Sequence, residues 1–232
     1  NILILIFQIT MYFLLGWKSF TPVISNNFLK EIKYNKWIPF SINYKSNKIK
    51  EKWNAEDLQI TTISKLTKRK NVDLVINAVQ SLGLSNIRFN IIVVLTNDNH
   101  RDLYNKHLRK LENKENIFIY KNISHLKVQK ILKKSHIFIL LSEKEPASIS
   151  NLEAMAYGNA LILGEDNGTA NYLDSNGGFI VNYDMLNVLK ALNNIVYNRS
   201  QLRKMGKYNI QKVQNNFNAK IIAKNFLDYL EI

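Results

Sequence analysis

The chain has 232 residues, a formal net charge of +14 and no cysteine. A hydrophobic content of 46% is enough to bury a core, which excludes a disordered basic tail. The lack of cysteine excludes disulfides, cysteine-ligated zinc and thiol catalysis. The charge points to nucleic acid, an anionic membrane or a phosphorylated ligand. However, 26 of the 32 cations are lysines and 32 further residues are asparagine, so A/T-rich coding bias could supply the diffuse part of this charge.

The first 15 residues are apolar apart from Asn1, Gln8 and Thr10. This run is shorter than the roughly 20 apolar residues that a membrane span needs. It also lacks the basic start and the small-residue cleavage site of a signal peptide. We expect a core strand or helix of a domain that begins upstream. The alternatives are a membrane-contacting segment and a true span.

Residues 21–52 have the composition of a linker. Seven lysines crowd this segment and only Glu31 and Glu51 oppose them: Lys30, Lys33, Lys36, Lys45, Lys48, Lys50 and Lys52. We expect a solvated face, with weak contact to anionic lipid as the functional alternative.

From residue 58 onward, strand patterns alternate with helix patterns. Strands are predicted at 58–66, 89–96, 116–123, 136–142, 160–165 and 177–182. Helices are predicted at 71–83, 100–113, 126–135, 150–159, 184–198, 200–217 and 218–232. This alternation predicts right-handed βαβ units, and therefore an α/β fold with a Rossmann-like parallel sheet and helices on both faces.

Ligands of such sheets bind beyond the carboxyl ends of the strands. Four cations lie within residues 65–70, directly after the first of these strands. Lysine ammonium groups suit phosphate as point charges. Neither of the glycine-rich patterns GxGxxG and GxxxxGK[ST] is present. A solvated basic turn is the simpler alternative.

A second polar loop follows the strand at 136–142. A helix begins near Ser148, whose hydroxyl is a plausible N-cap, and its free N–H groups suit a phosphate. Glu145 lies in the loop and Glu153 about one turn inside the helix. A carboxylate beside a phosphate site commonly accepts hydrogen bonds from sugar hydroxyls. Taken singly, the two acids also fit an exposed loop acid and an acid favoured by the helix dipole.

Two motifs in these loops resemble a known family. Glu145 and Glu153, with seven residues between them and Ala-Met-Ala-Tyr-Gly after the second, resemble the signature of retaining GT-B glycosyltransferases of group 1 (glycosyltransferase family 4). ISKLTKRKNVDLVINA resembles the family segment G-R-L-x-x-x-K-G-x-D, with Lys65 where Arg is usual and Lys70 at the family's Lys. The resemblance runs from about residue 20 to the end of the chain. It is greatest to enzymes of bacterial capsule and lipopolysaccharide synthesis.

The resemblance implies roles for seven residues. Glu145, the expected catalytic position, binds hydroxyls of the donor sugar, and Glu153 binds the nucleotide ribose. The donor diphosphate is bound by Lys65, Lys70, Ser148, Ile149 and Ser150. No cofactor or metal is expected, because fixed cations and a helix N-terminus stabilise the leaving diphosphate. The donor is a UDP-, GDP- or similar nucleoside-diphosphate sugar.

The resemblance also implies the domain organisation. Residues 1–52 are expected to be the remnant of an N-terminal acceptor domain and a linker. Residues 53–215 form the donor-binding domain, and residues 216–232 form a helix that returns toward the N-terminal domain. The chain is thus expected to be the C-terminal half of a GT-B fold, inactive without the other half.

The predicted function is transfer of a sugar, with retention and without a metal, to a cell-surface glycan or lipid-linked acceptor. The expected location is the cytoplasm, with peripheral contact at the inner face of the cytoplasmic membrane as an option, and nucleic acid is not an expected partner. Two alternatives stay open: a non-catalytic nucleotide-sugar binding module and, less favoured, a basic nucleic-acid-binding protein.

Overall fold

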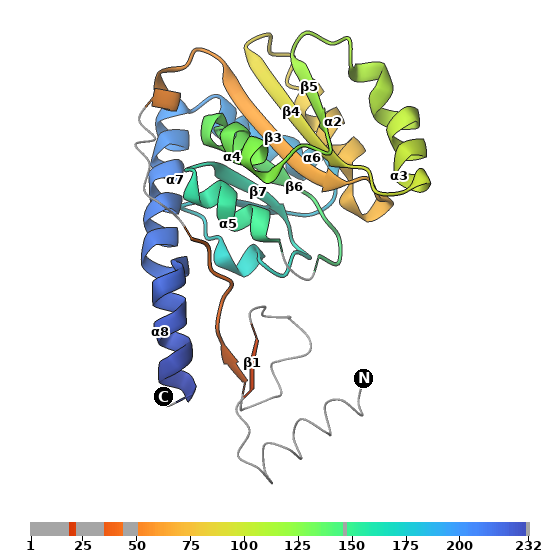
Figure 1. Ribbon diagram of the computed structural model, residues 1–232. Coiled ribbons are helices and arrows are strands. Elements are labelled where there is room, and N and C mark those ends of the chain that lie inside the picture. The colour runs from red at the N-terminus through yellow and green to blue at the C-terminus, as the bar shows by residue number, and fades with distance from the viewer. Residues whose placement is uncertain (1–18, 22–34, 44–50, 146–147, 231–232) are drawn as a thin grey trace.

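The computed structural model describes residues 19–21, 35–43, 51–145 and 148–230. Its centre is a six-stranded sheet of order β5-β4-β3-β6-β7-β8 in which all neighbouring strands are parallel (Figure 1). The strands are β3 (Leu58–Lys65), β4 (Ile87–Val94), β5 (Ile117–Lys121), β6 (Ile137–Leu140), β7 (Ala160–Gly164) and β8 (Gly178–Val181). All six predicted strands are present, and the predicted fold class is confirmed.

The strand order reverses direction between β3 and β6. From β3 the chain builds outward to β4 and β5, then crosses back so that β6 pairs with the other side of β3. In open α/β sheets, ligands bind in the crevice at the carboxyl ends of the strands where the strand order reverses. The ends of β3 and β6 are therefore the expected site.

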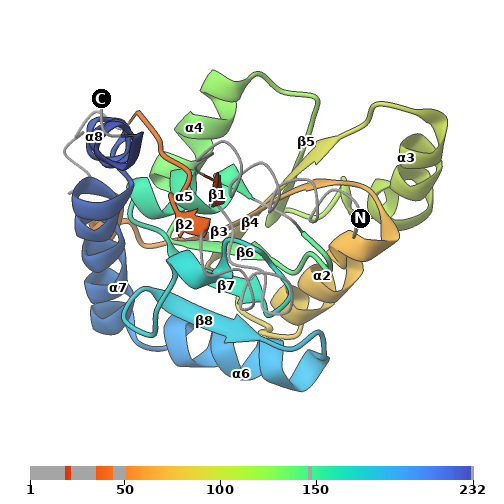
Figure 2. The ribbon, with the colours of Figure 1, turned by 90° about the horizontal axis from the view of Figure 1, so that it is seen from below.

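Helices cover both faces of the sheet (Figure 2). One face packs against α2 (Val72–Gln80) and α6 (Met185–Val196), and the other against α4 (His125–Lys134) and α5 (Ile149–Ala156). The period-two geometry of a strand divides its residues between these layers. Ile137 and Ile139 of β6 face the α2 and α6 layer, while Phe138 and Leu140 face the opposite layer. This two-sided burial explains why the strand is a continuous apolar run.

Glycines end two of the predicted helices as the sequence indicated. Gly83 follows α2 with φ of +62° and Gly158 follows α5 with φ of +68°, a conformation in which a side chain is strained. At Gly158 a Cβ would also lie 2.9 Å from Cδ1 of Ile210 in α7 (Arg199–Lys212). Gly158 therefore serves both the helix end and the close approach of α7.

The helix predicted over 100–113 is present but is not a single regular α-helix. The structure has α3 (Asp98–Leu103), then one wide helical turn over Tyr104–Leu108 and one tight turn over Arg109–Leu111. Tyr104, Leu108 and Leu111 are all buried against the sheet. These three residues keep the i, i+4, i+7 spacing that lies on one face of a helix, so the predicted apolar face persists through the two irregular turns.

The C-terminal part joins the segment that precedes the sheet. Helix α7 passes through a wide turn over Val213–Phe217 into α8 (Ala219–Leu230), which extends away from the sheet (Figure 1). The Ile42 N–H donates to the Phe217 carbonyl at 3.0 Å, and the Ala219 N–H donates to the Ile42 carbonyl at 3.2 Å. Earlier in the chain, β1 (Ser19–Thr21) and β2 (Asn35–Trp37) form a small parallel pair.

The expectation of a solvated basic segment is wrong for Lys52. This side chain is buried, and its ammonium donates to the carbonyls of Ser135 at 2.7 Å, Tyr157 at 2.7 Å and Gly158 at 2.8 Å. These carbonyls lie at the C-terminal ends of α4 and α5, where the helix dipole is negative. Lys52 thus joins two helices to the start of the sheet domain.

The other predictions about the N-terminal region concern mostly undescribed residues. Residues 1–18 and five of the seven crowded lysines lie outside the described ranges, and no side chain is described for Lys36. Across the described helices, none combines the length and the apolar character that crossing a bilayer demands.

Candidate functional site

The loops after β3 and β6 are held against each other by backbone and side-chain bonds. After β3 comes a short 3₁₀ helix over Lys68–Lys70, and Asn71 then adopts a left-handed conformation, with φ of 47°, to begin α2. The Asn71 amide donates to the Leu141 carbonyl at 3.1 Å and to the Glu143 carboxylate at 2.8 Å. The Glu143 N–H donates to the Arg69 carbonyl at 2.8 Å. These bonds hold the loop after β3 (residues 66–71, the basic loop) beside the loop after β6 (residues 141–145, the acidic loop).

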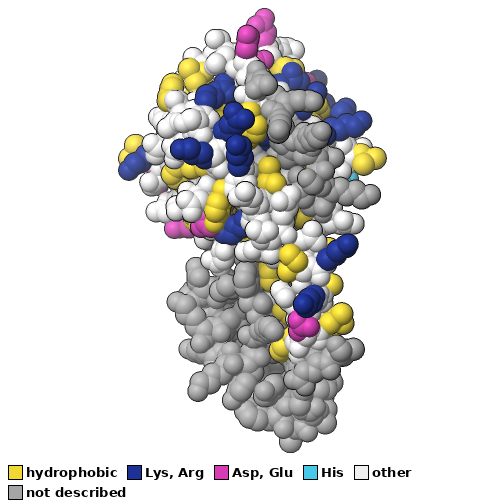
Figure 3. Space-filling view, turned by 90° about the vertical axis from the view of Figure 1, so that its left-hand side faces the viewer, with side chains coloured by type: hydrophobic (Ala, Val, Ile, Leu, Met, Phe, Trp, Pro, Cys, Tyr) yellow, Lys and Arg dark blue, Asp and Glu magenta, His cyan; other side chains and the backbone are white. Residues whose placement is uncertain are grey.

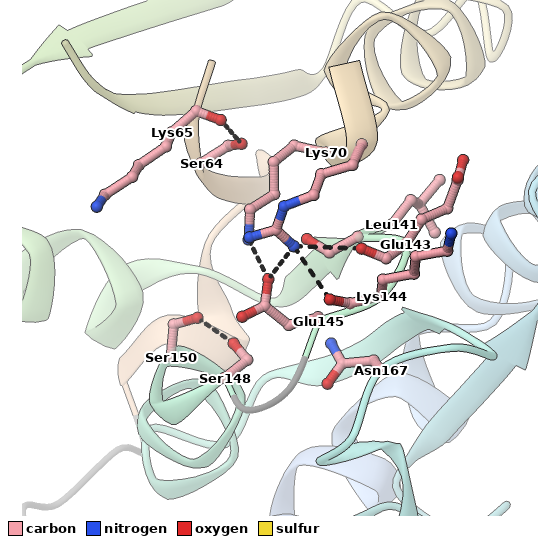
Figure 4. Close-up of polar contacts among 12 residues, drawn as sticks. Ser64, Lys65, Lys70, Leu141, Glu143, Lys144, Glu145, Ser148, Ser150 and Asn167 are labelled. Carbon is pink, nitrogen blue, oxygen red and sulfur yellow. Dashed lines mark hydrogen bonds and ion pairs between the residues drawn. The ribbon is translucent and has the colours of Figure 1, made fainter. Parts of the chain in front are cut away.

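An ion pair between Lys70 and Glu145 is the central feature of this site (Figure 4). The two side chains are only 12% and 11% exposed, so water screens the pair little. Arg69 Nη1 lies 3.2 Å from the same carboxylate oxygen, Oε2. The exposed loop acid considered for Glu145 is therefore wrong, because two cations from the other loop neutralise it.

Arg69 is a site residue that the sequence reasoning did not assign. Its guanidinium also donates to the backbone carbonyls of Glu143 at 3.2 Å and Lys144 at 3.4 Å. The available signal was its place among the four cations after β3, next to Lys70.

Lys65 does not join the ion pair. Its side chain is exposed and extends away from Glu145 in Figure 4. Among the described residues its ammonium has no hydrogen-bond or ion-pair partner. Of the two lysines that the sequence assigned to one ligand, the structure therefore holds only Lys70 against the acidic loop.

The N-terminus of α5 lies beside this pair, as the sequence predicted, but its capping differs. Ser148 has the extended backbone of an N-cap residue, yet its hydroxyl makes no capping bond and instead lies 2.7 Å from the hydroxyl of Ser150. Beneath the helix start, the Asn151 amide donates to Thr169 Oγ1 at 2.8 Å. Asn151 thus anchors the first turn of α5, which includes the exposed Ile149. The N–H groups of this turn receive no capping bond from the Ser148 side chain.

The loop after β7 forms hydrogen bonds with the acidic loop. The Gly168 N–H donates to the Glu145 carbonyl at 2.8 Å, and the Lys144 N–H donates to the Asp166 carboxylate at 2.8 Å. Lys144 has a φ of 47°, which turns the chain just before Glu145. The Tyr183 hydroxyl donates to the Ser142 carbonyl at 2.9 Å, and burial raises the pKa of this tyrosine to about 12. These contacts hold the backbone that carries Glu145.

Glu153 has a partner that the sequence reasoning missed. His125, the first residue of α4, places Nε2 2.5 Å from the Glu153 carboxylate. The glutamate is 17% exposed and the histidine 64%. The available signal was position: His125 follows the carboxyl end of β5, at the same edge of the sheet as the other site residues. Within the described ranges, no three His, Asp or Glu side chains are grouped as a metal site would require.

A parallel sheet whose strand order reverses at a charged crevice defines a Rossmann-like domain. Residues 43–212 match the family described as "Glycosyl transferases group 1", and the chain belongs to this family. The family resemblance noted in the sequence is confirmed. The chain is accordingly a member of a transferase family.

One curated relative is a "Glycogen synthase" of Clostridium botulinum (strain Alaska E43 / Type E3), 26% identical over 190 residues, or 68% of this chain and 38% of the relative. Among solved structures, Anabaena Alr3699/HepE in complex with UDP and glucose has a TM-score of 0.71 at 12% identity, covering 85% of this chain and 57% of that chain. Sucrose-phosphate synthase from Thermosynechococcus elongatus has a TM-score of 0.70 at 16% identity, covering 85% and 52%. The chain spans about four to six tenths of the length of these proteins. The structural likeness shows the GT-B type of fold.

Proposed function

We propose that the crevice between β3 and β6 binds a nucleoside-diphosphate sugar, and that the protein transfers this sugar with retention to a cell-surface glycan or lipid-linked acceptor. The observation that carries the proposal is the Lys70–Glu145 ion pair beside the N-terminus of α5. Family membership supports it. So do the structural neighbours HepE and Staphylococcus aureus TarM, both solved with UDP.

In this proposal the diphosphate lies between the basic loop and α5. Lys70 and Lys65 contribute cations, and the backbone of Ser148, Ile149 and Ser150 contributes N–H groups. The leaving diphosphate gains negative charge as the bond to the sugar breaks, so fixed positive charge at this place lowers the barrier. An ammonium has three N–H donors, so Lys70 can keep Glu145 and still donate to phosphate oxygens. These cations lead us to propose transfer without a metal ion.

The two glutamates contact the sugar groups in this proposal. Glu145, held in direction by Lys70 and Arg69, accepts hydrogen bonds from hydroxyls of the transferred sugar. Glu153 accepts hydrogen bonds from the ribose, for which it must exchange its contact with His125. Both acids are acceptors when ionised, and sugar hydroxyls are donors.

Calorimetric titration with UDP and GDP tests the donor site. The Glu153→Gln substitution should weaken binding of the preferred nucleotide about tenfold, since charge-assisted hydrogen bonds contribute roughly 1.5–3 kcal/mol each. Glu115→Gln is the matched control, because Glu115 is an exposed acid just before the amino end of β5, away from the carboxyl ends where the donor site lies. A folded chain that binds no nucleotide would contradict the proposal.

Transfer itself is tested on the whole protein with a sugar nucleotide and a glycan acceptor. Release of nucleoside diphosphate together with an elongated acceptor supports an enzyme. Binding without release supports the non-catalytic module. The anomeric configuration of the product, measured by proton NMR, decides between retention and inversion.

A further inference from the structure

A pocket lies near the amino ends of β3 and β6, at the opposite end of these strands from Glu145. Its volume is about 530 Å³. Trp53, which precedes β3, and His136, which precedes β6, line one side. The first turns of α7 line the other side with four cations: Arg199, Arg203, Lys204 and Lys207. The pocket is thus separate from the crevice at the carboxyl ends of the strands, and its volume falls within the range of about 300–1,000 Å³ found for small-molecule sites.

The positive charge of this pocket has no counter-charge in the described part of the chain. No acidic side chain lines the pocket, and none of its four cations forms an ion pair with a described residue. Farther along the same helix, Lys212 does have a partner, Asp174, at 2.6 Å. Figure 3 shows Lys and Arg side chains gathered on the upper part of the face that carries α7. Like charges brought together in a concave site repel each other, and a bound anion relieves that repulsion.

Helix geometry directs these cations to one place. Arg199, Arg203 and Lys207 are spaced four residues apart, which puts them on one face of α7. Arg199 Nη2 also donates to the Glu56 carbonyl at 3.0 Å, which holds one guanidinium at the start of the helix. In a row of cations that only faces solvent, neither the Arg199–Glu56 hydrogen bond nor the facing side chains of Trp53 and His136 would be expected.

The opposite wall of the pocket is rigid. His136 uses both ring nitrogens, with Nδ1 accepting from the Gln59 N–H at 3.0 Å and Nε2 lying 2.8 Å from the Lys52 carbonyl. The Trp53 ring packs edge-on to His136, with 5.6 Å between centroids. A Cβ at Gly206 would lie 2.5 Å from Cζ2 of Trp53, so this glycine leaves room for the ring. Trp53 therefore offers a fixed, partly exposed aromatic edge beside the cations.

We propose that this pocket binds a phosphate group, with the cations of α7 holding the anion and Trp53 packing against the carbon skeleton that carries it. Arginine and lysine together suit phosphate because one offers a fork of donors and the other a mobile point charge. Two sources present this chemistry: a small soluble phosphate ester, and the headgroup of an anionic phospholipid. The inference does not depend on the donor site.

The test measures binding of inorganic phosphate and glycerol 3-phosphate by calorimetry, and binding to phosphatidylglycerol and phosphatidylcholine vesicles by co-sedimentation. The variant R203Q/K204Q/K207Q removes three pocket cations. The matched control K130Q/K133Q/K134Q removes three exposed lysines from α4, which lies over a different part of the sheet. Thermal melts by circular dichroism confirm that both variants fold, which is expected because all six side chains are exposed.

We expect the pocket variant to lose at least about tenfold in affinity and the α4 control to stay within about twofold of the wild type. Loss of soluble-phosphate binding in the pocket variant alone identifies a soluble ester. Loss confined to phosphatidylglycerol vesicles identifies a lipid headgroup. Equal losses in both variants would show that only diffuse charge acts, and a folded wild type that binds neither phosphate nor anionic vesicles would also overturn the proposal.

Discussion

Lys70 and Glu145 form an ion pair across the point where the strand order of the sheet reverses. The two residues lie 75 positions apart in the chain, on the loops after β3 and β6. The pair is nearly enclosed, and Arg69 contacts the same carboxylate. The site thus carries more positive than negative charge, and Lys70 and Arg69 already hold the Glu145 carboxylate in one orientation.

Replacing Lys70 with Gln should weaken nucleoside-diphosphate binding by about tenfold or more, because a buried charge-assisted contact to the diphosphate is lost. The control is Lys68→Gln on the same short 3₁₀ helix, where the lysine is exposed. Calorimetry should show the control within about twofold of the wild type. Similar losses for both variants would mean that net charge, and not the position of Lys70, governs binding.

Removing His125 should tighten nucleotide binding by about two- to fivefold, because Glu153 then accepts the ribose hydroxyls without giving up a partner. The double variant His125→Ala/Glu153→Gln isolates this coupling, since the gain from His125→Ala should vanish when the carboxylate is gone. The measurement is a double-mutant cycle by calorimetry. A gain that persists in the Glu153→Gln background would show that His125 acts elsewhere.

Binding of the sugar nucleotide should be unchanged when divalent metals are removed with EDTA, because Lys65, Lys70 and the α5 N-terminus supply the positive charge in the proposed site. Titrations of the preferred nucleotide with EDTA and with added Mg²⁺ should give affinities within about twofold of each other. A tenfold dependence on Mg²⁺ would instead mean that the diphosphate binds as its metal complex.

Lys52→Met should lower the free energy of unfolding by about 2–4 kcal/mol, because three carbonyls at the ends of α4 and α5, two of them in buried contacts, lose their donor. Burial lowers the pKa of Lys52 well below its ordinary value, while the negative ends of α4 and α5 favour the charged form. Urea unfolding gives the free energy, and Lys130→Met on the exposed side of α4 is the control. Equal stability of wild type and Lys52→Met would contradict this role.

Stability should fall in mild acid because of His136. Burial, mainly, lowers the pKa of its imidazole to about 4, against about 6.5 in the unfolded chain. Between these values the unfolded chain binds more protons, so the stabilisation is complete above about pH 6.5 and is lost as the pH falls toward about 4. From about pH 7 to about pH 4.5 the loss is about 2–3 kcal/mol.

The variant His136→Gln isolates this effect, since it keeps a polar side chain and removes the proton site. Urea unfolding at both pH values should show the wild type losing about 2–3 kcal/mol more than the variant. The same pH dependence in both proteins would assign the acid sensitivity to other groups.

The sequence alone determined the sheet and the location of the candidate site. Apolar runs such as 137–140 identified strands buried on both faces, because alternation disappears when each face of a strand has its own layer of helices. The segments containing Lys70, Glu145 and Glu153 were found because ligand-binding residues follow the carboxyl ends of parallel strands, and because their spacing resembles a family motif.

Tertiary structure alone decided which of these side chains meet. The pairing of Glu145 with Lys70 and Arg69 depends on loops that are distant in sequence and adjacent because β3 pairs with β6. The pairing of Glu153 with His125 depends on the packing of α5 beside α4. The burial of Lys52 could not be predicted from the sequence, because a lysine in a basic segment is usually solvated. Its acceptors are carbonyls at the ends of α4 and α5, which come together only in the folded protein. Local pattern fixes an element's type and face, whereas contacts between elements depend on the topology that packs them together.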